Sequence, residues 1–161
     1  MTEPRWLNDE EQQLWRLLLS AVRKMTRCMD VTLQEESGIS ASEFAVLVNL
    51  SESGPEGMRL RDLCRGLDWD RSRTSHQITR MERRGLVDKT RCEGDARGVL
   101  VTITGDGIRR LEQAAPEHVE SVRRLLFDNL SKEQSTVIHQ VLVDVLAVKN
   151  VPGAEESEIE D

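Results

Sequence analysis

Apolar residues recur every three or four positions through most of this chain, the spacing that places side chains on one face of an α-helix. Such stretches cover residues 14–33, 44–50, 108–126 and 137–146. Only residues 86–92 and 99–104 are instead rich in β-forming residues, and they flank a glycine-containing loop at 93–98. The chain is therefore predicted to be mainly α-helical with one small β-hairpin.

Helix-capping residues precede most of these stretches. Asn8, Asp70 and Thr104 each stand where a side-chain oxygen can accept a hydrogen bond from the first turn of a helix. Residues 40–43 and 131–134 have the Ser-x-x-Glu and Ser-x-x-Gln patterns of a capping box. These signals predict helices that begin next to all five positions.

Charge is distributed very unevenly along the chain. The net charge is −7, which by itself argues against a nucleic-acid partner. Residues 58–110, however, contain 13 Lys and Arg against 8 Asp and Glu, a local net charge of +5. Because salt screens charges beyond about 8–10 Å, a polyanion responds to this local surplus. The central third of the chain can therefore bind nucleic acid although the whole chain is acidic.

The most basic segment is a predicted helix at residues 71–84. Ile78 and Met81, followed by Leu86, are its few apolar residues, so most of its surface needs a polar partner. A short helix at 60–67 and a turn precede it, and the hairpin follows. This order predicts a winged helix-turn-helix, in which the basic helix enters the DNA major groove and the hairpin is the wing.

Four segments carry a resemblance to the multiple antibiotic resistance regulator (MarR) family of bacterial transcription factors. They are ISASEFAVLVNL (39–50), LRDLCRGLDWDRSRTSHQITRMERRGLV (60–87), DARG (95–98) and VTITGDG (101–107). The sequence departs from the family pattern at Arg61, where Ser is frequent, and at His76, where Arg is frequent. The second departure leaves the base preference open.

The resemblance implies a homodimer whose terminal helices form the dimer body. The expected organisation is a dimerisation helix at 1–38, a winged helix-turn-helix lobe at 39–104, dimerisation helices at 105–149 and an acidic disordered tail at 150–161. The terminal helices also have more apolar positions than one subunit can bury, which independently favours a twofold interface. Two symmetric lobes predict a palindromic operator in double-stranded DNA.

Candidate DNA-binding residues follow from the helix and the wing. Arg73, His76, Gln77 and Arg80 are expected on the open face of the recognition helix, with Arg73 and Gln77 as the leading candidates for reading bases. Phosphate contacts are expected from Arg71, Ser72, Thr74, Ser75 and Arg91. By resemblance, Asp95 orients Arg97 at the wing tip so that the guanidinium enters the minor groove.

Two side chains are candidates for regulation. Cys92 follows Arg91, and nearby guanidinium groups favour the thiolate that oxidants attack, although a spectator thiol is the simpler interpretation. Family effectors often bind between dimer body and lobe, where Trp15 is a candidate pocket residue. By resemblance, the expected function is a homodimeric regulator that a small molecule or thiol oxidation releases from DNA. Members of this family are most often repressors, so repression is the expected output.

The sequence gives no support for an enzyme, a metal or cofactor protein, or a membrane or secreted protein. Phosphate-binding loops, metalloprotease motifs and nucleophile elbows are absent, so neither an enzyme nor a cofactor or metal is expected. The odd number of cysteines fits a reducing compartment, and no apolar run or leader indicates a membrane or secretion. A bacterial cytoplasmic protein at the nucleoid is expected. The alternative is a winged helix that binds only other proteins.

Overall fold

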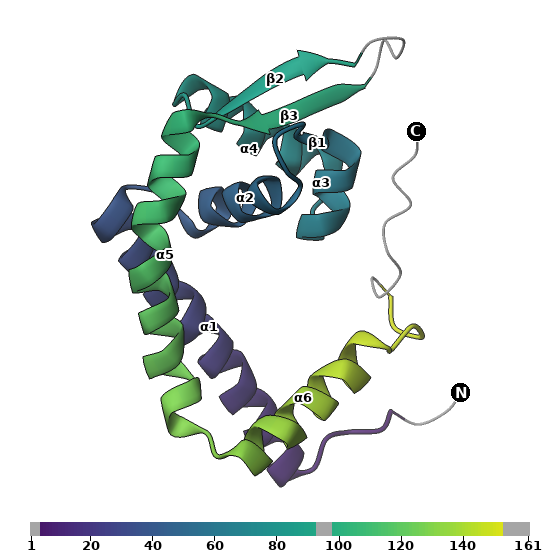
Figure 1. The fold of residues 1–161 in the computed structure, drawn as a ribbon. Coiled ribbons are helices and arrows are strands. Elements are labelled where there is room, and N and C mark those ends of the chain that lie inside the picture. The colour runs from purple at the N-terminus through teal and green to yellow at the C-terminus, as the bar shows by residue number, and fades with distance from the viewer. Residues whose placement is uncertain (1–3, 93–97, 153–161) are drawn as a thin grey trace.

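The computed structural model describes residues 4–92 and 98–152 of the 161-residue chain. These residues form six α-helices, one 3-10 turn and three short strands (Figure 1). The helices are α1 (Asp9–Ser37), α2 (Ala41–Glu52), α3 (Leu60–Leu67), α4 (Arg71–Arg83), α5 (Gly105–Leu125) and α6 (Lys132–Leu146), with the 3-10 turn η1 at Phe127–Asn129. The strands are β1 (Met58–Arg59), β2 (Val87–Arg91) and β3 (Val99–Ile103). The predicted mainly helical fold with a small hairpin is confirmed.

Side-chain caps begin the helices at the predicted places. Asn8, Ser40 and Ser131 each form a complete capping box with the residue three positions later. The Thr104 hydroxyl accepts a hydrogen bond from the Gly107 amide at 3.0 Å and starts α5. Each cap satisfies a backbone donor that has no partner within its helix and contributes about 1 kcal/mol. The local sequence therefore determines where these helices begin.

The part of the chain from α2 to β3, which we call the lobe, surrounds a single apolar core. Helices α2, α3 and α4 bury their apolar faces against one another and against the sheet. The fully buried side chains in this core include Val46, Leu47, Leu50, Leu63, Ile78, Met81, Val87 and Val101. The thin apolar face predicted for the basic helix is thus the side by which α4 is anchored.

The sheet has one more strand than the sequence predicts. Strands β2 and β3 form the expected antiparallel hairpin, with Val87 opposite Ile103 and Arg91 opposite Val99. The two-residue strand β1 pairs with the other edge of β3 and gives the order β1-β3-β2. Two residues are too few to show an alternating pattern, so sequence periodicity could not reveal β1.

Helices α1 and α5 lie side by side and form what we call the arm, with the lobe at one end (Figure 1). The Thr32 and Ser121 hydroxyls hydrogen-bond across the pair at 3.1 Å. Pro116 lies inside α5, but the helix continues without interruption from Gly105 to Leu125. The arm places the lobe far from the N-terminal half of α1.

Helix α6 leaves the far end of the arm and packs little against the rest of the subunit (Figure 1). None of its residues is buried. Its exposed apolar side chains are Val137, Ile138, Val141, Leu142, Val143, Val145 and Leu146. An isolated helix of this length is marginally stable in water, so α6 needs a partner surface. Within the described residues, no helix has an apolar stretch that could cross a lipid bilayer.

Candidate nucleic-acid interface

Helix α4 begins directly after a tight turn that follows α3. Asp68 ends α3 in the left-handed conformation, with φ of 52°. The Asp70 carboxylate then accepts a hydrogen bond from the Arg73 amide at 2.8 Å, as its predicted capping role requires. The turn and cap fix the direction of α4 relative to α3, which is the geometry of a helix-turn-helix.

One face of α4 is open to solvent and strongly basic. The exposed residues along it are Arg71, Ser72, Arg73, Ser75, His76 and Arg80. The first turn of α4 carries no acidic side chain, and the carboxylate of the N-cap Asp70 is bonded to the Arg73 amide. An α-helix fits into the DNA major groove, and the exposed arginines of α4 would then face base edges and phosphates.

Gln77, which was expected on this face, and Thr74, which was expected to contact a phosphate, point inward instead. Gln77 is 4% exposed and Thr74 is fully buried, and the Thr74 hydroxyl donates to the Asp70 carbonyl at 2.9 Å. Each stands one helical turn before a core residue, Thr74 before Ile78 and Gln77 before Met81, and so shares its face. The prediction that these two side chains lie open to DNA is wrong in placement, and the helical spacing could have shown it.

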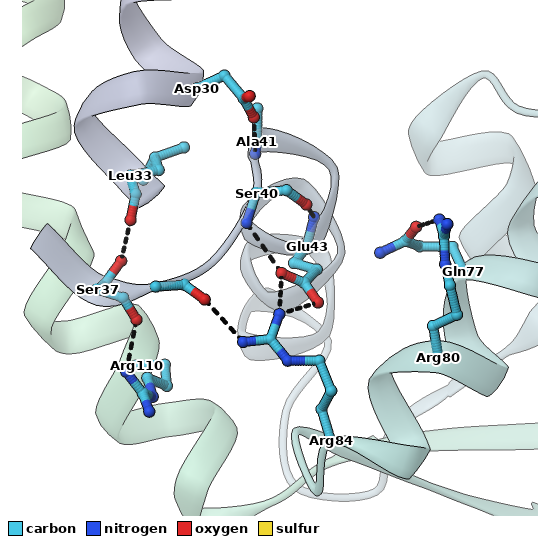
Figure 2. Close-up of polar contacts among 11 residues, drawn as sticks. Asp30, Leu33, Ser37, Ser40, Ala41, Glu43, Gln77, Arg80, Arg84 and Arg110 are labelled. Atoms are coloured by element: carbon cyan, nitrogen blue, oxygen red, sulfur yellow. Dashed lines mark hydrogen bonds and ion pairs between the residues drawn. The ribbon is translucent and has the colours of Figure 1, made fainter. Parts of the chain in front are cut away.

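Two of the exposed arginines of α4, Arg73 and Arg80, have intramolecular partners that the sequence did not reveal. The Arg73 guanidinium lies over the Trp69 ring, with its central carbon 4.2 Å from the ring centroid. An arginine on an aromatic face is attracted by the ring electrons and keeps its donors free at the edge. Arg80 donates to the side-chain oxygen of Gln77 (Figure 2). Both guanidinium groups are therefore oriented by neighbouring side chains.

The hairpin packs against α4 and presents its own basic end. Lys89 on β2 lies 2.9 Å from the Glu82 carboxylate of α4, which joins the hairpin to the helix. Arg91 is exposed at the end of β2. The predicted wing residues Asp95 and Arg97 lie outside the described residues, so their roles stay predictions.

A partly buried ion pair connects Arg84, the C-cap residue of α4, to Glu43 on α2, beside the joint between α1 and α2, residues 37–40 (Figure 2). Both carboxylate oxygens of Glu43 accept from Arg84 Nη1 at 2.6 Å. The Glu43 side chain is only 7% exposed, and one of its oxygens also accepts from the Ser40 amide at 2.9 Å. Arg84 Nη2 donates to the Gly38 carbonyl at 2.7 Å. The glutamate of the capping box thus also anchors the end of the recognition helix.

Contacts from the arm hold the same joint from its other side. Arg110 on α5 donates to the Ser37 carbonyl at 2.6 Å (Figure 2). The Asp30 carboxylate on α1 accepts from the Ala41 amide at 2.8 Å. Together these bonds satisfy the backbone where the arm meets the lobe, and they set the orientation of α4 relative to the arm.

Replacing Arg84 with Ala is expected to destabilise the protein by about 1–3 kcal/mol. The change leaves the buried Glu43 carboxylate without its cation, and the partial exposure of Arg84 keeps the loss below that of a fully buried pair. Arg83→Ala removes the same charge from an exposed neighbour and should change stability by less than about 0.5 kcal/mol. Urea unfolding of both variants measures the difference, and equal losses would contradict the anchoring role.

His118 on α5 packs against α2 without a full set of hydrogen bonds. Its ring centroid lies 4.4 Å from that of Phe44, and its buried Nδ1 has no partner among the described residues. Partial burial lowers the pKa of this histidine, because packing removes part of the water that would hydrate the protonated ring. His118 therefore belongs to the packing of α5 on α2. Among the described residues, no three or more His, Cys, Asp or Glu side chains are grouped so that they could hold a metal ion.

The regulatory candidates are spread over the molecule. Cys92 is half-buried at the end of the hairpin, where its amide donates to the Gly98 carbonyl at 3.0 Å. Trp15 is 52% exposed on α1, in the half of the arm far from the lobe. It lines neither of two pockets of about 480 and 430 Å³. The larger pocket is lined by Arg84, Leu86, Asp106, Arg109, Arg110 and Gln113.

Comparisons with known proteins agree with this geometry. The MarR family model matches residues 37–98. The chain is 33% identical to Sco3205 of Streptomyces coelicolor, a MarR family regulator solved in complex with DNA, with a TM-score of 0.88 and coverage of 97% and 98% of the two chains. It is 40% identical to AbsC of the same organism, with a TM-score of 0.83 and coverage of 88% and 95%.

A curated relative matches over a shorter region. The transcriptional regulator PecS of Dickeya dadantii is 29% identical over 105 residues, which are 65% of this chain and 63% of PecS. The chain thus spans somewhat less than two thirds of that relative.

Proposed function

This chain belongs to the MarR family of DNA-binding transcriptional regulators, and we propose that it acts as a homodimeric repressor on a pseudo-palindromic operator. The observation that carries the proposal is the open basic face of α4, on which Arg73 and Arg80 stand two turns apart. Phosphate contacts by the surrounding side chains would position the helix, and these two arginines would read bases.

The proposed dimer rests on the apolar surface that one subunit leaves open. Helix α6 buries none of its residues, and the first turns of α1 also expose Leu14, Trp15, Leu17 and Leu18. A twofold copy would cover both segments with the same segments of its partner. Two lobes related by that axis would meet equivalent half-sites about one DNA turn apart, which requires an operator with matching symmetry.

The hairpin would supply a second contact in each half-site. Arg91, which is exposed at the end of β2, would contact a phosphate at the base of the wing, and Asp95 and Arg97 are proposed as the wing pair that reaches the minor groove. Wing and helix together would hold each lobe on two faces of the duplex. A bacterial regulator of this kind works in the cytoplasm, at the nucleoid.

Release would follow from a change in the distance or angle between the two lobes. A small molecule bound near the arm can cause it only through different affinities for the two arrangements. Oxidation of Cys92 is the second candidate, because this residue closes the hairpin by its bond to Gly98. Steric blocking of a promoter by the bound dimer would then end.

Titration of the dimer with duplex DNA at several salt concentrations tests the proposal. A duplex selected by the protein from a randomised library should bind on the order of 10³-fold tighter than a scrambled duplex of equal composition. Between 50 and 200 mM salt its affinity should fall by about 10³-fold, since several phosphate contacts release counterions. Equal binding to both duplexes would contradict sequence-specific recognition, and no binding to either would favour a winged helix that serves only protein contacts.

A further inference from the structure

The inner side of α4 carries a polar contact that packing does not require. Gln77 is 4% exposed, and its side-chain oxygen accepts a hydrogen bond from Arg80 Nη2 (Figure 2). Arg80 itself is exposed on the outer surface of the helix. Gln77 therefore reaches from the core side of α4 to a terminal nitrogen of a guanidinium that faces solvent.

This contact leaves most of the arginine available. A guanidinium has five N–H donors in a planar fork, so one bond to Gln77 leaves four for another partner. A side chain already held in one orientation loses less conformational entropy when it binds. Bidentate pairing with guanine depends on the plane of the fork, so this orientation affects which base is accepted.

We propose that Gln77 is a positioning residue that sets the base preference of the protein through Arg80, without contacting DNA itself. The proposal rests on the proposed function, in which the open face of α4 enters the major groove. Direct reading of a base by Gln77 conflicts with its placement, because its side chain is buried and its oxygen is occupied by Arg80. Arg73 does not depend on Gln77, because its guanidinium group is already oriented by contact with the Trp69 ring.

The test is a double-mutant cycle between Gln77→Met and Arg80→Ala. Binding is measured to a duplex selected by the wild-type protein and to duplexes with each base pair of the half-site replaced in turn. Arg80→Ala should lower discrimination at one position by about 10-fold or more. Gln77→Met keeps the side-chain volume but removes the acceptor, and should relax preference at the same position. In the Arg80→Ala background it should add nothing.

Two further variants separate positioning from a general packing defect. Gln77→Asn keeps a buried amide but is one methylene too short to reach Arg80, so it should behave as Gln77→Met does. Gln77→Glu keeps the acceptor at the right distance and should retain the discrimination ratio, even if the added charge weakens binding to every duplex. The salt dependence should be the same for Gln77→Met and wild type.

Each outcome decides between specific alternatives. Relaxed preference at a different base pair from that of Arg80→Ala, or additive effects of the two changes, would mean that Gln77 reads a base itself. Unchanged preference in both Gln77→Met and Gln77→Asn would overturn the positioning role alone. Unchanged binding by Arg80→Ala would overturn the docking of α4 and, with it, both proposals.

Discussion

Replacing Leu142 with Asp is expected to convert the proposed dimer into a monomer and to lower affinity for a two-half-site operator by on the order of 10²-fold or more. Leu142 is 52% exposed in the single subunit and lies on α6, which buries none of its own residues. Burial of a leucine contributes about 1.5–3 kcal/mol at each copy of an interface, and a carboxylate there must instead lose its hydration. Because a twofold interface through α6 would contain the residue twice, the loss would be doubled.

Sedimentation velocity measures the first effect and operator titration the second. Thr136→Asp is the matched control, since it adds the same charge to an exposed polar position of the same helix. It should leave both the oligomeric state and DNA affinity unchanged. A Leu142→Asp protein that still sediments as a dimer would show that α6 lies outside the interface.

Replacing Gly107 with Ala is expected to destabilise the protein by roughly 3 kcal/mol. A Cβ at this position would lie 2.2 Å from the Leu86 carbonyl oxygen and 2.9 Å from Ile103 Cγ1. That carbonyl already accepts from the Thr104 amide at 3.1 Å, so it cannot move without breaking the connection between hairpin and α5. The added methyl group therefore forces α5 away from the lobe.

Gly105→Ala provides the control two residues earlier on the same helix. Its Cβ would approach only the end of the Arg109 side chain, at 3.8 Å. Alanine favours the helix over glycine by up to about 1 kcal/mol, so this variant should be equally or more stable than wild type. Thermal unfolding at one fixed protein concentration measures both changes, since a dimer's midpoint depends on concentration. Equal midpoints for the two variants would contradict the close approach at Gly107.

Much of the architecture was predictable because its determinants are local. The caps at Asn8, Ser40, Asp70, Thr104 and Ser131 act within one helical turn, and each helix begins where its cap predicts. The hairpin was predictable for the same reason, since its two strands are neighbours in sequence. Strand β1 was not predictable, because its partner lies some forty residues away and two residues carry no pattern.

The candidate site was only partly predictable from the sequence. The basic face of α4 followed from its composition, and Arg71, Arg73, His76 and Arg80 are exposed as expected. The prediction for Gln77 and Thr74 is wrong because their residue type and their helical spacing indicate opposite faces of α4. Their polar side chains suggested solvent, while the positions of Ile78 and Met81 placed them on the buried face.

The sequence by itself determined the helices, the hairpin and a local surplus of positive charge, because propensity, capping and charge are properties of neighbouring residues. Only the tertiary structure decided which way α4 faces and how the lobe is fixed to the arm. Glu43 meets Arg84 across 41 residues and Arg110 meets Ser37 across 73. Such pairs form only after packing brings distant segments together, and a single sequence contains no signal for which of its many charges will meet.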